Sequence, residues 1–346
     1  MNRAPELPLQ RTRTATGLGP NPRGRTSSPL AWRPSVGDRP ARIPGKSRRF
    51  PVAPGPAPGR NPPVGEDPVD MPLRLLFATD LHGRRAAYEE LFARARRESP
   101  DAVLLGGDLL PLPHGRAEGL LEPQRSFVRD FLEPALLSLR AGGGPPVYGI
   151  FGNDDWAAVR PSFAALEAAG AYHDLHMRRL PLGDHFLAGY SCVPVTPFRM
   201  SDFDRFDAPG WSPARPPRRV LLSDRGRVRE GSLVELRQRP SIAADLRTLE
   251  RAGPPGRTIY VCHTPPHGTR LDRMHGGRAI GSPSLRAFLE RAQPPLSLHG
   301  HVHESPRVSG SIEDRIDRTL CVNPGDSRTR LRAVLVEVDD TARLLA

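Results

Sequence analysis

Three histidines stand at alternate positions in the stretch SLHGHVHES, residues 297–305: His299, His301 and His303. In an extended chain alternate side chains point to the same side, so these imidazoles could reach one site. Neutral imidazole is the commonest metal ligand in proteins, and the spacing therefore indicates metal binding. A single loop histidine is more often solvated or hydrogen-bonded to backbone, so this interpretation depends on partners elsewhere in the chain.

Residues that can bind a metal also follow four other apolar segments. Asp80 and His82 follow LRLLFAT, Asp108 follows DAVLLGG, Asn153 follows PVYGIFG, and His263 follows RTIYVC. We predict that each of these segments is a strand. In an open α/β sheet, ligands bind outside the carboxyl ends of the strands, so these side chains are expected to meet the histidines of SLHGHVHES in space.

The types of these residues indicate a particular metal chemistry. Carboxylates and imidazoles with one amide oxygen suit Mn²⁺, Fe²⁺ or Zn²⁺, and without clustered cysteines a structural zinc site is not expected. Seven protein ligands are too many for one ion that keeps open positions. Two ions about 3.5 to 4 Å apart that share one carboxylate use all seven and leave room for water and substrate.

The elements that must position these residues alternate along the chain. Helical periodicity marks residues 84–98, 122–140, 161–170, 241–253 and 282–292, and the apolar segments between them read as strands. TLCVNPG and RAVLVEV are predicted as closing strands. This alternation favours a layered α/β fold.

Two segments depart from that pattern. Residues 1–70 hold 15 of the 41 prolines and 12 basic against 5 acidic residues, so they carry +7 of the net charge of +12. Such a segment cannot bury enough apolar surface to offset its ordering entropy, and we expect a disordered extension. Residues 71–346 are expected to form the folded domain, with a loop-rich insert at about 191–240. MPLRLLFATD begins a strand directly, so Met71 is a candidate for the true start.

Composition also bears on compartment and partners. No stretch of about 20 apolar residues occurs, so no membrane span is expected. Cys192, Cys262 and Cys321 are few and far apart, which favours a reducing compartment, and we expect a cytoplasmic protein. Nucleic acid is not expected as a partner, because the chain beyond the extension carries only +5 (12 minus 7) and the arginines of the extension are scattered. The sequence predicts no oligomeric state.

Five blocks, DLHG, GGD, GNDD, HTPP and GHVH, resemble in order the motifs of the calcineurin-like metallophosphoesterase superfamily, over roughly residues 73–340. HTPPHGTRLDRMHGG and VNPGDS resemble the branch described as Icc-related predicted phosphoesterases. The resemblance implies a four-layer α/β/β/α sandwich with a two-metal site at one edge. It implies that the first ion is held by Asp80, His82 and His303, that Asp108 bridges, and that the second ion is held by Asn153, His263 and His301. His299 is not a ligand in this pattern.

The implied reaction is hydrolysis of a phosphodiester or phosphomonoester by a metal-activated hydroxide. Better-known members carry a histidine after the asparagine, in GNH[DE], whereas this chain has Asp154, followed by Asp155. A carboxyl is charged at pH 7 and donates no proton unless burial or a neighbouring carboxylate raises its pKa. Asp154 is therefore either the general acid or a hydrogen-bonding residue of the turn. His267, in HTPPHG, and His114 are candidate substitutes, and His267 is preferred because it is nearer a ligand.

Two classes of function follow. The first is an enzyme that acts on a small phosphoester, which the complete set of seven ligand types favours. The second is a non-catalytic metal-binding or interaction module on the same fold, which the missing histidine favours. Arg84 and Arg85 begin a predicted helix and could grip a phosphate, with a solvated helix turn as the alternative.

Some further residues have alternative roles. Asp272 is a candidate to orient His267. A direct role at the metal site for Asn323 or Asp326 is less expected than a structural one. The aromatic residues of the insert could stack on a substrate or cover a core, and the second is more common; they are Phe198, Phe203, Phe206 and Trp211.

Overall fold

The structure, a computed structural model, describes residues 72–113, 119–327 and 329–345. The predictions for residues 1–70, for a start at Met71 and for His114 lie outside the described residues. The described part of the chain contains two six-stranded sheets and two two-stranded sheets.

The first large sheet carries the first three metal-binding motifs. Its strand order is β16-β15-β1-β2-β3-β4. Strands β1 to β4 are parallel, whereas β15 and β16 continue the sheet in antiparallel pairing. The strands are β1 Leu73–Ala78, β2 Ala102–Gly106, β3 Val147–Ile150, β4 His173–Asp174, β15 Ala333–Val338 and β16 Ala342–Leu345.

The second large sheet carries HTPP and GHVH. Its order is β13-β14-β12-β11-β6-β5, with the four central strands parallel and an antiparallel strand at each edge. The strands are β5 Arg179–Leu182, β6 His185–Tyr190, β11 Thr258–Cys262, β12 Leu296–Leu298, β13 Glu313–Ile316 and β14 Thr319–Val322. In the two large sheets, the sequence pattern did not identify β4, β5, β6, β13 or β16.

The two sheets pack face to face through one apolar cluster. Leu75 and Phe77 of β1 share this cluster with Ile259 and Val261 of β11 and with Leu298 of β12. All five side chains are fully buried. Burial of both sheet faces explains why these strands are apolar on both faces over most of their length.

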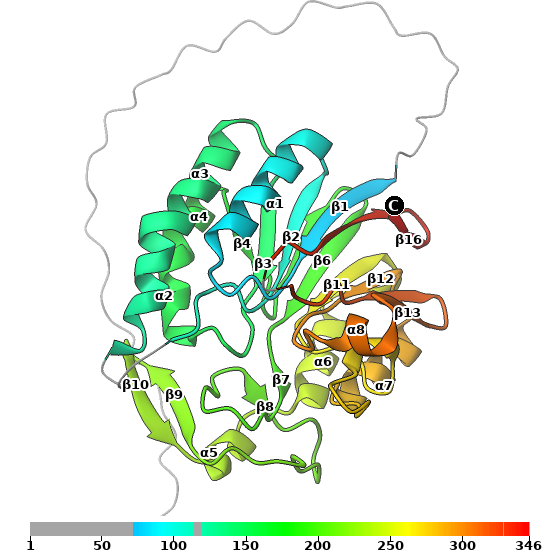
Figure 1. The fold of residues 1–346 in the computed structure, drawn as a ribbon. Helices are drawn as coiled ribbons and strands as arrows, with labels where there is room; N and C mark the ends of the chain where they lie inside the picture. Colours follow the sequence, from blue (N-terminus) through cyan, green and yellow to red (C-terminus); the bar gives the residue numbers. More distant parts are fainter. Residues whose placement is uncertain (1–71, 114–118, 328, 346) are drawn as a thin grey trace, which may run out of the picture. The chain divides into compact units, whose positions relative to one another are not determined.

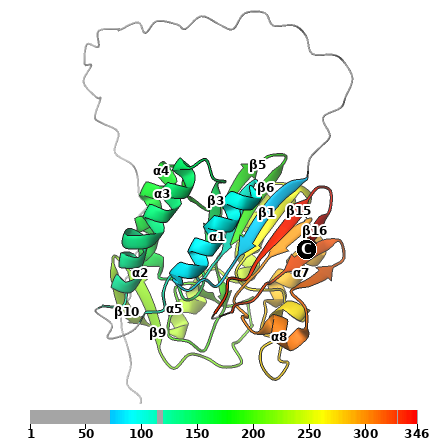
Figure 2. The ribbon, with the colours of Figure 1, turned by 45° about the horizontal axis from the view of Figure 1, so that its top comes forward.

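Helices cover the outer faces of both sheets, which gives the predicted four layers (Figures 1 and 2). Helix α1 (Arg85–Glu98) lies over the first sheet, and the other helices on that side are α2 Glu122–Phe127, η2 Val128–Leu132, α3 Glu133–Ala141, η3 Ala157–Phe163 and α4 Ala164–Ala168. Helices α6 (Ile242–Arg251) and α7 (Pro283–Ala292) cover the second sheet, where Phe288 packs against Tyr260 of β11 with ring centroids 5.0 Å apart. The four-layer prediction is confirmed.

Local sequence explains how these helices begin and which face they bury. Helix α1 buries one face, which consists of Ala87, Tyr88, Leu91, Phe92 and Ala95. Ser241 and Ser282 cap α6 and α7, each accepting a backbone N–H three residues on, and Pro283 occupies the first turn of α7. The predicted helix over 122–140 forms, but its middle, η2, is a π-helical turn.

Residues 191–240 are more ordered than a set of loops. They contain a parallel pair, β7 (Val193–Pro194) with β8 (Asp204–Arg205), and a hairpin, β9 (Val220–Asp224) with β10 (Arg227–Gly231). Helix α5 (Leu233–Gln238) follows, and a small apolar core lies beneath these elements. The remaining short helices are η4 Pro255–Arg257, η5 Arg270–Asp272 and α8 Ser305–Ser309. No helix in the described ranges is long and apolar enough to cross a membrane.

Candidate metal centre

The predicted ligands lie on the short loops that leave five parallel strands, β1, β2, β3, β11 and β12. Four of the seven have a left-handed backbone: Asp80 with φ 56°, His82 with φ 45°, Asp108 with φ 51° and His301 with φ 66°. Residues other than glycine adopt this conformation rarely and at a cost of about 1–3 kcal/mol, and such strain clusters at functional sites.

Four of these ligands form a first group. Asp80, His82, Asp108 and His303 each offer one ligand atom, and these atoms all lie within 4.8 Å of one another. His303 Nε2 lies 3.1 Å from Asp80 Oδ1 and 3.2 Å from His82 Nε2. Two carboxylates and two imidazoles at this spacing are a donor set that suits a divalent transition-metal ion.

The other three ligands form a second group that shares Asp108. Asn153 Oδ1 lies 2.6 Å from His301 Nδ1 and 3.2 Å from His263 Nε2. His263 Nε2 is also 3.3 Å from Asp108 Oδ2, so Asp108 contacts both groups. The Nδ1 of His263 donates to Gly106 O at 2.8 Å, which orients the ring with Nε2 toward the centre.

Two glycines allow the loops to approach this closely. A Cβ on Gly152 would lie 2.2 Å from Asp108 Oδ1 and 2.6 Å from His263 Nε2. A Cβ on Gly300 would lie 2.5 Å from Asp80 Oδ2 and 2.0 Å from the hydroxyl of Thr79. Any side chain at either position would therefore displace a predicted ligand.

The carboxylates and imidazoles perturb one another strongly. Burial acts to raise the pKa of Asp108, but the ion pair with His263 outweighs it and holds the pKa well below its usual range. Asp80 has a lowered pKa for the same reasons beside His303. Burial opposes protonation of the two histidines, yet these pairs raise the pKa of His263 to about 10 and that of His303 to about 9. The carboxylates of Asp80 and Asp108 are therefore charged, and because they are buried, they are stable only with positive charge beside them.

The remaining imidazoles suit a metal in a different way. Burial, followed by the nearby charge of His263, lowers the pKa of His301 to about 3, and burial also lowers that of His82. Both rings are therefore neutral near pH 7 and have a lone pair available. His263 and His303 carry the protons that now balance the charge of the carboxylates, and bound divalent ions would replace these protons. With those protons gone, charged carboxylates, neutral imidazoles and one amide oxygen form a donor set that fits divalent ions.

Asp154 stands beside the centre, at the position where the motif GNH[DE], which the GNDD block resembles, has a histidine. Its backbone N–H donates to Asp108 Oδ1 at 2.8 Å, and its Oδ2 is 4.0 Å from His82 Nδ1. Burial, and then the charges of Asp108 and Asp155, raise the pKa of Asp154 to about 8. Its side chain keeps 20% exposure and lines the cavity described below.

Asp155 has a different position. Its side chain is fully buried and accepts three backbone N–H groups, from Gly152, Leu109 and Leu110, at 2.8 to 3.0 Å. It therefore ties the loop after β3 to the loop after β2. The turn role considered for Asp154 also has a contact in the structure, because Asp154 Oδ1 accepts a hydrogen bond from Asn153 Nδ2 at 3.1 Å.

His267 lies in the wall of the same cavity, and its side chain is 44% exposed. Its Nδ1 is 3.5 Å from Asp272 Oδ2. Asp272 is fully buried, and the same oxygen accepts the backbone N–H of Gly268 and Gly281. Asp272 thus holds the loop that carries His267 through these backbone hydrogen bonds. It also lies beside the His267 ring, where the sequence analysis considered it as a candidate to orient that ring.

The centre opens into a cavity of about 450 Å³. Asp108, Asn153, His301 and His303 lie on its floor with Asp154. Two walls rise from separate parts of the chain: one comes from residues 194–198 and 211–215 of the insert, and the other from residues 274–283, before α7. Most wall residues are apolar, which is usual for a small-molecule site with a few polar groups at its base.

Buried Asp207 joins these two walls. Its carboxylate accepts from the hydroxyl of Ser282, from Ser284 N at 3.0 Å and from Ser284 Oγ at 2.6 Å. Ser282 and Ser284 flank the start of α7, whereas Asp207 follows β8 in the insert. The wall residues Arg215, Met274 and Arg278 were not singled out from sequence, and only the cavity identifies them.

Other residues named from sequence have structural roles. Asn323 donates to the carbonyls of Leu271, Gly300 and Val302 and so supports the GHVH loop. The Nδ1 of His299 lies within 3.1 Å of the carbonyls of Cys262 and Thr264. Phe203 and Phe206 are core residues, whereas Phe198 and Trp211 line the cavity.

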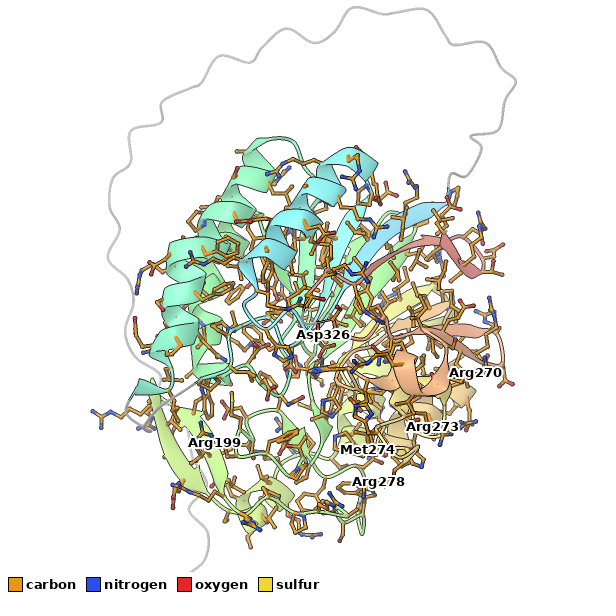
Figure 3. All side chains as sticks on the ribbon, viewed as in Figure 1. Arg199, Arg270, Arg273, Met274, Arg278 and Asp326 are labelled. Atoms are coloured by element: carbon orange, nitrogen blue, oxygen red, sulfur yellow. The ribbon has the colours of Figure 1, made fainter. Side chains whose placement is uncertain are left out.

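The two arginines at the start of α1 contact groups of the protein and do not face the cavity. Arg84 donates to Asp326 Oδ1 at 2.5 Å and to Ser327 O at 2.6 Å. Figure 3 shows Asp326 near the middle of the domain. The guanidinium of Arg85 lies over the ring of Phe131, 5.3 Å from its centroid. Neither side chain lines the cavity.

Comparison with known proteins agrees with this geometry. The sequence model of the calcineurin-like phosphoesterase family matches residues 73–305. None of the curated proteins matches the sequence. One crystal structure shares 18% identity and superposes with a TM-score of 0.52, covering 80% of this chain and 99% of its own. At this identity the likeness shows the fold alone.

Two looser structural matches have TM-scores below 0.5. They are TT1561 of Thermus thermophilus (TM-score 0.47, 18% identity, 80% of this chain and 99% of that chain) and a dimetal phosphatase from Danio rerio (0.44, 13%, 78% and 93%). The family match extends over more than half of the 346 residues and includes all five motif blocks. The chain therefore belongs to the calcineurin-like phosphoesterase family.

Proposed function

We propose that this protein is a dinuclear metal-dependent hydrolase of a small phosphodiester or phosphomonoester. The observation that carries the proposal is the convergence of two ligand groups on Asp108 at the floor of a cavity of about 450 Å³. Shared carboxylates are the usual means of holding two ions close together. Family membership supports metal-dependent phosphoester chemistry in general.

In the proposed reaction, a bond forms between phosphorus and a water oxygen, and the bond from phosphorus to the leaving oxygen breaks. Two bound divalent ions supply a water of lowered pKa and neutralise charge on the phosphoryl oxygens. The protein supplies the ligands in a strained, preorganised arrangement and walls that limit water. Asp154 and His267 line the same cavity, and we propose that one of them delivers the proton to the leaving oxygen.

The ion type and location are also proposals. The mixed oxygen and nitrogen donors suit Mn²⁺, Fe²⁺ or Zn²⁺. A cytoplasmic location is supported by the three cysteines, which are all free and buried. We propose no membrane or nucleic-acid partner, and the substrate is a small molecule.

The direct test strips the full chain of metal, adds Mn²⁺ back, and compares hydrolysis of bis-p-nitrophenyl phosphate with that of p-nitrophenyl phosphate. Metal-dependent release of p-nitrophenol from either ester supports the proposal, and the preferred ester distinguishes diesterase from monoesterase. Binding of two ions with no turnover of either ester would instead favour the non-catalytic module, which the replacement of the usual histidine by Asp154 makes the second candidate.

A further inference from the structure

We call the cavity of about 450 Å³ beside the predicted ligands the metal cavity. A second cavity adjoins it and is lined mainly by arginine. Its volume is about 400 Å³, and its six lining residues are Pro197, Arg199, Arg215, Pro216, Arg218 and Arg219. We call it the arginine groove. Pro197 and Arg215 line both cavities, so the arginine groove and the metal cavity meet at these residues.

The charge of the arginine groove is only partly neutralised. Arg219 pairs with Glu230, across the β9–β10 hairpin. Arg199 makes one long hydrogen bond, from Nη2 to Pro113 O at 3.4 Å. Arg215 and Arg218 are exposed, and among the residues that the structure describes neither has a carboxylate within 4.0 Å or a side-chain hydrogen bond. At least two guanidinium groups are therefore available to bind an anion beside the metal cavity.

The fold holds these arginines at the cavity edge. Residues 199 and 221 are joined by a backbone hydrogen bond of 2.7 Å, which fixes Arg199 beside β9, as Figure 3 shows. Arg218 and Arg219 lie directly before β9, which begins at Val220. Met274 and Arg278, labelled in the same figure, come from the opposite wall of the metal cavity.

We propose that the substrate carries a second phosphate group, which the arginine groove binds while the scissile phosphate lies at the metal centre. Guanidinium groups bind phosphate through strong, often bidentate hydrogen bonds. The volume of the groove, about 400 Å³, is large enough for one phosphate with a small linker. This inference rests on the proposed function and narrows its substrate class.

The test compares two diesters with the same scissile bond: the p-nitrophenyl ester of thymidine 5′-phosphate, with and without a phosphate on the 3′-hydroxyl. We expect the second phosphate to lower KM roughly tenfold or more, the effect of one charge-assisted hydrogen bond. Arg218→Gln and the double variant Arg199→Gln/Arg218→Gln should remove this preference. Arg227→Gln, which removes an exposed arginine of β10 outside both cavities, should keep it.

A binding experiment separates this inference from the proposed function. Calorimetry on the metal-stripped chain compares thymidine 3′,5′-bisphosphate with thymidine 5′-phosphate. Preference for the bisphosphate that is lost in Arg218→Gln supports the arginine groove even where neither ester is hydrolysed. Hydrolysis of both esters with equal KM, or equal binding of both nucleotides, overturns the arginine groove and leaves the proposed function standing. Tighter binding of a thymidine oligonucleotide than of the bisphosphate would overturn a small-molecule occupant.

Discussion

Asp108 lies between two sets of ligands and touches both. Its carboxylate is 3.3 Å from His263 Nε2 and 3.9 Å from His82 Nε2, and it accepts the backbone N–H of Asp154 at 2.8 Å. Because the residue is buried, its charge is stabilised only by these neighbours and by whatever cation they hold. A change of charge at this single position therefore affects the whole centre.

Close approach of the loops gives a first prediction. Gly152→Ala should abolish metal binding and activity, because the added methyl would lie 2.2 Å from Asp108 Oδ1. We expect the variant to fold, since the clash is confined to the centre, and to bind less than about a tenth of the wild-type metal, as mass spectrometry of the purified protein would show.

Gly119→Ala is the matched control. A Cβ on Gly119 meets nothing within 4 Å, so metal content should equal that of the wild type. Wild-type metal content in Gly152→Ala would contradict the described packing of the ligands.

The leaving group distinguishes the two candidate proton donors. p-Nitrophenolate leaves without protonation, whereas an alkoxide needs a proton. If Asp154 supplies it, Asp154→Asn should lower kcat about 100-fold for an alkyl ester and less than about threefold for the p-nitrophenyl ester, at unchanged metal content. His267→Gln should show the same selective loss if His267 is the donor. If kcat fell equally for the alkyl and the p-nitrophenyl ester in both variants, neither Asp154 nor His267 would be the proton donor.

The elements that hold these residues were predictable to different degrees. Strands β1, β2, β3, β11 and β12 are mostly apolar, and the ligand positions follow directly from where these segments end. Strands β5 and β6 were missed because RLPL and HFLAGY are short and interrupted by Pro181 and Gly189. Strand β6 pairs with distant β11, and the edge strand β5 pairs with β6, so no local pattern reveals the pairing that holds them in the sheet.

A buried carboxyl in the insert gives a prediction for pH. Burial raises the pKa of Asp204 to about 8, against hydrogen bonds from Thr196 that oppose the shift. The folded state thus holds this proton more tightly than the unfolded state, so the stabilisation is complete below about pH 4 and is lost as pH rises through about 8. Asp204→Asn should flatten the fall in Tm between pH 5 and pH 9, measured by thermal unfolding of the metal-free chain.

Asp184→Asn serves as the comparison for this experiment. Asp184 is 75% exposed, in the turn between β5 and β6, and its removal should leave the pH profile of Tm as in the wild type. The same pH profile in Asp204→Asn and the wild type would contradict a buried, protonated Asp204.

At the scale of the whole described domain, the site exists only because two sheets pack together. Asp80, Asp108 and Asn153 leave one sheet, whereas His263 and His301 leave the other. The sequence alternation predicted layers, but the four-layer arrangement came from the family resemblance. The cavity walls were not predictable in detail, because they depend on contacts such as that of Asp207 with Ser284, which join segments 77 residues apart.

The most direct test of the two-metal account is the number of ions bound by the full chain, measured by calorimetric titration of the metal-stripped protein with Mn²⁺. We predict two ions per chain in the wild type and in Asp130→Asn, which removes an exposed carboxylate of η2 that pairs with Arg129. Asp108→Asn should weaken both binding events and abolish hydrolysis, because the bridging charge is gone. One ion per chain in the wild type, or two ions bound with unchanged affinity in Asp108→Asn, would contradict the account.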